Sequence, residues 1–133
     1  MIGSSDQAVL VKAGDDVILP CRIEPPRSAD KMTVEWSRPD LNPKYVLIRQ
    51  QGHKVPHSRL NPLYRQRTSL FAPELRHGNI SLKLSNVQFS DEGPYKCFVP
   101  TLHSSTLIQL RVGKDQSSER WWEVSFKRPL FLL

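Results

Sequence analysis

The sequence lacks the features that mark membrane-spanning segments, enzymes and metal sites. No apolar run reaches the roughly 18 residues that a membrane helix needs. There is no glycine-rich phosphate loop and no G-x-S-x-G motif of a serine hydrolase. The four histidines do not follow the spacing of zinc ligands: His53, His57, His77 and His103. We therefore expect a protein that is not an enzyme and has no catalytic residues, cofactor or metal site.

Cysteines and dense blocks of like charge are also scarce. Cys21 and Cys97 are the only cysteines, and they lie too far apart for a C-x-x-C motif. The 19 Lys and Arg residues against 13 Asp and Glu give a net charge of +6, but the basic residues are spread along the chain. A positive balance could suit nucleic acid, an anionic membrane or an acidic protein. Without a basic block, we interpret it as a mildly basic soluble surface and expect no nucleic-acid partner.

Apolar and polar residues alternate in five short segments. These segments are residues 17–23, 32–37, 80–85, 95–99 and 108–112. A period of two gives each segment one face for a core, which includes Leu82, and one face for solvent or a partner. Turn-forming residues separate the segments, and eleven scattered prolines argue against long helices. The pattern predicts one all-β domain, either a sandwich or a barrel.

Four residues occupy characteristic places in this pattern. Cys21 and Trp36 lie at core-facing positions of two early segments, and residues 91–97 read D-x-G-x-Y-x-C through Tyr95 and Cys97. This sequence resembles the Cys…Trp…Cys pattern of immunoglobulin domains. The resemblance implies a disulfide between two sheets, Trp36 packed against it, and a tyrosine corner at Tyr95. Two free thiols are the alternative, which the surrounding pattern disfavours.

A disulfide between Cys21 and Cys97 has consequences for stability and location. Closing a loop of about 76 residues contributes about 4 kcal/mol in the chain-entropy model. Disulfides persist in oxidising compartments, so we expect a cell-surface protein, with a secreted form as an option. Residues 1–5 lack the basic start and apolar core of a secretory signal. Either the chain is cytosolic or its signal has been removed, and the disulfide favours removal.

From about Ala13 to Gly113 the chain resembles a variable-type immunoglobulin domain. More narrowly, it resembles the butyrophilin family and the related myelin oligodendrocyte glycoprotein, in particular the butyrophilin-like proteins of bony fishes. The motifs are G-D-D-V-I-L-P-C at 14–21, M-T-V-E-W at 32–36, Y-R-Q-R-T-S-L at 64–70, G-N-I-S-L-K-L at 78–84, F-S-D-E-G at 89–93 and C-F-V at 97–99. The resemblance implies a V-set β-sandwich of two antiparallel sheets with Greek-key connections and one inter-sheet disulfide.

The chain departs from the family at two places. Ser37 follows the core tryptophan, where butyrophilins usually have an aromatic residue. Residues 114–133 do not resemble the constant-type domain that many members carry next. We therefore expect an immunoglobulin-like domain at residues 1–113 and a tail or linker at 114–133.

The resemblance, together with the sequence motifs and the strand pattern, suggests several residue roles. Arg67 and Asp91 would form an ion pair across one end of the sandwich. Asn79 begins the only glycosylation sequon, Asn79-Ile80-Ser81, and is a candidate glycan site. Loops at 23–31, 50–55 and 100–105 would cluster at one end. The candidate partner face on the outside of one sheet comprises Glu35, Ser37, Lys96, Phe98, Leu107 and Gln109.

These expectations favour a recognition module of a membrane-anchored cell-surface protein. By resemblance, it would bind a protein receptor on an immune cell and modulate T-cell responses. The first alternative is homophilic adhesion, through a homodimer formed by the same sheet face. A second alternative is binding to a polyanion such as heparan sulfate, driven by the positive net charge.

Overall fold

The computed structural model describes residues 1–50, 53–55 and 57–114. The expected tail beyond residue 114 lies outside the described residues. The strands are β1 (Ile2–Gly3), β2 (Ala8–Lys12), β3 (Val17–Leu19), β4 (Arg22–Ile23), β5 (Val34–Ser37), β6 (Tyr45–Gln50), β7 (His53–Lys54), β8 (Thr68–Ser69), β9 (Leu82–Leu84), β10 (Gly93–Val99) and β11 (Ser104–Gly113). Within these described ranges, five short 3-10 helices lie in the connections: η1 (His57–Arg59), η2 (Pro62–Tyr64), η3 (Ala72–His77), η4 (Phe89–Asp91) and η5 (Pro100–Leu102).

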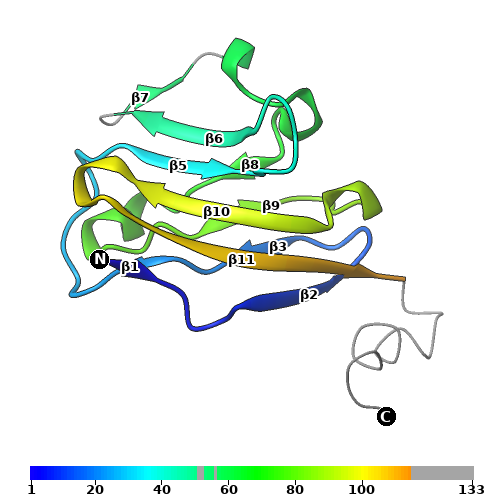
Figure 1. Ribbon diagram of the computed structural model, residues 1–133, viewed down its shortest axis with the longest axis horizontal. Helices are drawn as coiled ribbons and strands as arrows, with labels where there is room; N and C mark the ends of the chain where they lie inside the picture. Colours follow the sequence, from blue (N-terminus) through cyan, green and yellow to red (C-terminus); the bar gives the residue numbers. More distant parts are fainter. Residues whose placement is uncertain (51–52, 56, 115–133) are drawn as a thin grey trace.

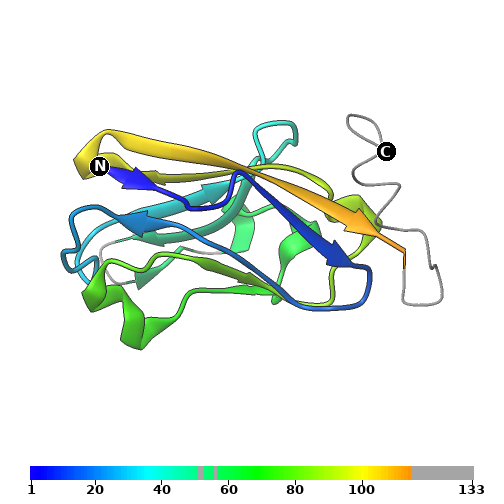
Figure 2. The same cartoon turned by 90° about the horizontal axis from the view of Figure 1, so that it is seen from below.

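The strands form two layers, as Figures 1 and 2 show. The larger sheet has the order β2-β11-β10-β5-β6-β7, and the sheet opposite has the order β3-β9-β8. The short pair β1-β4 extends the smaller layer, since β4 follows β3 along the chain. Pairing is antiparallel except between β11 and β2. The expected all-β sandwich is confirmed, but the edge pair β2–β11 is parallel and departs from the two purely antiparallel sheets that were expected.

The core lies between the two sheets, around the disulfide. Cys21 and Cys97 are bonded, with 6.8 Å between their Cα atoms, and both are fully buried. Trp36 and Leu82 are also fully buried in the same cluster. The indole N–H of Trp36 donates a hydrogen bond to the carbonyl of Ile80 at 3.0 Å, so its polar atom is satisfied inside the core.

The alternation of apolar residues breaks down in β6. Register shifts between Trp36 and Ser37 of β5 against β6, so the pairing contains a bulge. As a result, the neighbouring residues Val46 and Leu47 both belong to the core cluster. The following residue, Ile48, is paired with Glu35 and is buried, but it lies outside that cluster.

Candidate recognition surface

The outer side of the larger sheet, which we call the front face, collects all six candidate partner residues. Residues directly opposite in an antiparallel ladder point to the same side of a sheet. Phe98 lies opposite Glu35, and Lys96 lies opposite both Ser37 and Leu107. Gln109, two residues after Leu107, lies on the same side by alternation. The neighbours Trp36 and Cys97 point the other way, into the core.

These six residues differ in how much surface they offer. Leu107 is 55% exposed, which is unusual for a leucine in the middle of a long strand. Glu35, Lys96, Phe98 and Gln109 are half-buried. Ser37 departs from the expectation of an open contact residue, because it is only 6% exposed. It lies on the front face, but its neighbours leave it little surface to offer.

A hollow of about 190 Å³ lies in the front face around Ser37. Its lining residues are Glu35, Ser37, Pro39, Lys44, Tyr45, Lys96 and Phe98. The ammonium of Lys96 lies 5.3 Å from the centre of the Phe98 ring. The Lys44 ammonium and the Arg59 guanidinium lie 5.3 Å and 5.9 Å from the centre of the Tyr45 ring. Each pair is within the range of a cation–π contact.

Sequence reasoning missed the β6 side of this surface. Lys44 and Tyr45 line the hollow where β6 begins, and Arg59 of η1 lies over the Tyr45 ring. A simple period of two could not place any of these three residues, because of the bulge in β6 and the irregular chain at η1. The sequence feature that could have indicated this surface is the run of three apolar residues after Tyr45, which is too long for strict alternation. Such a run indicates a bulge or a strand covered on both sides.

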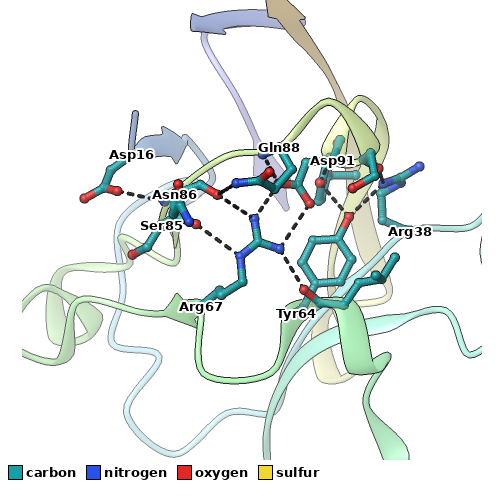
Figure 3. A network of polar contacts seen from close by, with 11 residues as sticks. Asp16, Arg38, Tyr64, Arg67, Ser85, Asn86, Gln88 and Asp91 are labelled. Atoms are coloured by element: carbon teal, nitrogen blue, oxygen red, sulfur yellow. Dashed lines mark hydrogen bonds and ion pairs between the residues drawn. The ribbon is translucent and has the colours of Figure 1, made fainter. Parts of the chain in front are cut away.

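A polar network lies where β5 ends and β10 begins (Figure 3). The hydroxyl of Tyr95 donates to the carbonyl of Asp91 at 2.7 Å, which is the geometry of a tyrosine corner. Because the Tyr95 hydroxyl donates its only proton to Asp91, it accepts the bond from the Tyr64 hydroxyl at 2.8 Å. The Tyr64 hydroxyl in turn accepts from the Arg38 guanidinium at 2.7 Å. The chain of bonds ties the residue after β5 to η2, β10 and η4.

Two arginines complete the network. The structure places Arg67 beside Asp91, with nitrogen–oxygen distances of 2.5 and 3.3 Å, and Asp91 is fully buried. Arg67 also donates to the carbonyls of Leu63 and Asn86, so its guanidinium joins several connections at this end (Figure 3). Arg38, which sequence reasoning missed, is buried and makes a bidentate pair with Asp40 at 2.7 and 2.9 Å.

Burial and hydrogen bonding fix the protonation states in this network. Burial raises the pKa of both Tyr64 and Tyr95, so their hydroxyls stay protonated as donors. Burial by itself lowers the pKa of Arg38, but its hydrogen bonds and charge interactions with Asp40 and the two tyrosines outweigh this and raise it. The Arg38 guanidinium in turn lowers the pKa of Asp40. Arg38, Asp40 and the two tyrosines therefore each keep one protonation state at physiological pH.

Two of the three expected loops lie at the opposite end of the sandwich, because the β4–β5 and β10–β11 connections are both at that end in Figure 1. The third, expected at 50–55, includes residues that lie outside the described ranges. Arg49 donates to the carbonyl of Asp30 at 2.9 Å and so links β6 to the β4–β5 connection. The last of the three loops is shorter than expected, because β11 already begins at Ser104.

Asn79 lies on the loop that leads into β9, on the smaller sheet. It is half-buried, and its side-chain oxygen accepts bonds from the Ser81 hydroxyl at 2.6 Å and the Ser81 amide at 3.2 Å. Its amide nitrogen reaches Glu74 at 3.3 Å. The sequon therefore occupies a turn away from the front face.

Across 1–50, 53–55 and 57–114, no group of three His, Cys, Asp or Glu residues is placed to hold a metal ion. Within the same ranges, none of the helices has the length and apolar character to cross a membrane.

Comparison with known proteins gives a consistent match. Residues 4–112 match the model of the immunoglobulin V-set domain. The chain is 40% identical over 89 residues to human myelin-oligodendrocyte glycoprotein, covering 64% of this chain and 34% of that protein. It is 33% identical over 109 residues to human butyrophilin subfamily 1 member A1, covering 80% of this chain and 20% of that protein. The crystal structure of bovine butyrophilin superposes with a TM-score of 0.74 at 26% identity, over 86% of this chain and 54% of the other.

Proposed function

Since this chain belongs to the immunoglobulin V-set family, with butyrophilin and myelin-oligodendrocyte glycoprotein among its relatives, we propose that it is the extracellular recognition domain of a butyrophilin-like cell-surface protein. In this proposal the front face binds a protein receptor on leukocytes and thereby modulates T-cell responses. The chain spans at most about a third of the two relatives compared above, so the proposal concerns one domain of a larger, membrane-anchored protein.

The observation that carries the proposal is the exposed apolar surface of the front face. Leu107 points away from the core and is 55% exposed, and the half-buried Phe98 lies on the same face. Neither side chain belongs to the core cluster. Fully burying a leucine contributes roughly 1.5–3 kcal/mol, so covering the exposed half of Leu107 would contribute about 1 kcal/mol to a complex. An apolar centre with a polar rim is typical of a protein interface.

The proposed mechanism is contact without chemistry. A single sheet face offers a small interface, and small interfaces between cell-surface proteins are weak individually. Several copies on one membrane bind together, which raises the effective concentration of each and gives a stable contact between cells. The binding energy would come from covering the apolar centre and from the charges around it.

Homophilic adhesion through the same face is the second candidate. A two-fold pair would place each copy's front face against the identical face of its partner. Lys44, Arg59 and Lys96 would then oppose the same cations, with Glu35 as the only carboxylate among the residues that line the hollow. Juxtaposed like charges cost free energy, so we favour a different protein as the partner.

Fluorescent tetramers of the whole chain separate these candidates. We expect them to stain a subset of leukocytes at physiological salt and to leave cells that display this same chain unstained. Phe98→Ala should weaken the staining while the melting temperature changes little. Staining confined to the self-displaying cells would replace the receptor proposal with homophilic adhesion, and absence of staining on both would reject the front face as a recognition surface.

A further inference from the structure

The cations of the front face are arranged around aromatic rings and not in a row. Lys96 lies over Phe98, while Lys44 and Arg59 lie on the ring of Tyr45. Lys96 occupies the middle of the face, because its strand neighbours are Leu107 on β11 and Ser37 on β5. Positive charge and apolar surface therefore alternate over the same few residues.

Negative charge is scarce at the same place. Of the seven residues that line the hollow, Glu35 alone is acidic, against Lys44 and Lys96. Asp40, the next carboxylate along the chain, is already held by both nitrogens of the Arg38 fork. Adding Arg59 beside Tyr45 leaves the hollow and its rim with an excess of positive charge.

We propose that the partner of the front face is an acidic protein surface, in which an Asp or Glu side chain enters the hollow between Lys44 and Lys96 and an apolar side chain beside it covers Leu107. This inference rests on the proposed function and specifies the chemistry of the partner. A carboxylate between two ammonium groups is attracted to both of them, and the partly covered hollow screens this attraction less than open water does.

The surface favours a protein over a sulfated polysaccharide. A polyanion chain is recognised by clustered Lys and Arg residues that follow its repeating charges. On the front face, Leu107, Phe98 and Tyr45 interrupt the cations, and the hollow of about 190 Å³ has the size of a side chain and not of a chain of sugars. Apolar contact beside each charge is what a folded acidic protein can supply.

Charge reversal in the tetramer-staining assay tests this inference. Lys96→Glu and Lys44→Glu should each lower leukocyte staining about tenfold or more, because each replaces an attraction with a repulsion. The control is Arg22→Glu on β4, an exposed cation in the other layer whose reversal changes the net charge equally. All three variants should keep the wild-type melting temperature, since the altered side chains lie outside the core cluster.

Treatment of the leukocytes identifies the class of ligand. Staining that survives heparinase but is lost after mild proteolysis supports an acidic protein. Staining lost after heparinase overturns the inference in favour of heparan sulfate. If the wild-type chain stains and Lys96→Glu and Lys44→Glu stain equally well, this inference fails while the proposed function stands. If the wild-type chain stains no leukocyte, the proposed function fails and this inference fails with it.

Discussion

At the scale of single residues, the buried Arg38 guanidinium determines which residue can occupy position 93. A Cβ atom on Gly93 would lie 2.5 Å from a guanidinium nitrogen of Arg38, which already bonds Asp40 and Tyr64. The backbone at Gly93 also has φ of +151°, which other residues rarely adopt. The D-x-G-x-Y-x-C motif therefore requires glycine here because Arg38 fills the space, in addition to the turn that the motif suggests.

Gly93→Ala should destabilise the fold by about 2 kcal/mol or more, from backbone strain and displacement of Arg38. Gly3→Ala is the matched control, because a Cβ at Gly3 meets no atom within 4 Å. Chemical denaturation of the two variants measures the difference. Equal unfolding midpoints would show that Arg38 moves aside without cost.

Asn79 is the second residue whose role can be tested alone. We expect the chain secreted from animal cells to carry a glycan there, since Asn79, the half-buried first residue of the sequon, lies on a turn beside the smaller sheet. Enzymatic removal of N-glycans should lower the mass of the wild-type chain and leave Asn79→Gln unchanged. A wild-type mass without glycan would reject the site. Because Asn79 lies outside the front face, Asn79→Gln should leave leukocyte staining intact.

At the scale of the element, the two sides of β10 have different roles: one side stabilises the core, and the other carries proposed contact residues. Its residues alternate between buried and half-buried along the whole strand. Phe98 and Val99 are neighbours, but Val99 is fully buried in the core and Phe98 is on the front face. One strand therefore carries the disulfide and the corner tyrosine on one side and the proposed contact residues on the other.

We expect Val99→Ala to cost about 2 kcal/mol through lost burial and a cavity, and Phe98→Ala to cost less than about 1 kcal/mol. Binding should respond in the reverse order, with Phe98→Ala the weaker binder. Thermal unfolding measures the loss of stability in each variant, and tetramer staining measures the loss of binding. A large loss of stability in Phe98→Ala would place this ring in the core and remove it from the recognition surface.

The sequence was sufficient for β10 but not for β6, and the reason is physical. Strict alternation from Tyr95 to Val99 fixes which side faces the core, and pairing then brings Glu35 and Leu107 to the other side. In β6 a bulge shifts the register, so two neighbouring residues face the core. Bulges, and the burial of Arg38 by partners distant in sequence, depend on tertiary contacts that a local pattern does not contain.

At the scale of the whole molecule, the buried tyrosines of the polar network make the free energy of unfolding depend on pH. Burial raises the pKa of Tyr64 and Tyr95 in the folded chain above the value in the unfolded chain. Their contribution to stability is complete below the unfolded pKa of about 10 and is lost as the pH rises above it. The fold should therefore lose stability at alkaline pH through these two hydroxyls.

Tyr95→Phe tests this coupling. At neutral pH the variant should lose about 1–3 kcal/mol, because its ring no longer bonds Asp91 and leaves the Tyr64 hydroxyl with one partner fewer. Above pH 10 its stability should fall less steeply than that of the wild-type chain. Denaturation midpoints measured from pH 7 to 11 provide both values. Parallel curves for the two proteins would show that the network does not control alkaline stability.

At the scale of the whole molecule, Leu107 and Ile18 are exposed apolar side chains on strands of opposite sheets, and substituting each in turn tests recognition by the front face most directly. Leu107 on β11 is 55% exposed on the front face, and Ile18 on β3 is 52% exposed on the other sheet. The measurement is leukocyte staining by tetramers of Leu107→Asp and Ile18→Asp at equal concentration. Recognition by the front face predicts that Leu107→Asp loses staining and Ile18→Asp keeps it. If Leu107→Asp keeps its staining and Ile18→Asp loses it, recognition through the front face is contradicted.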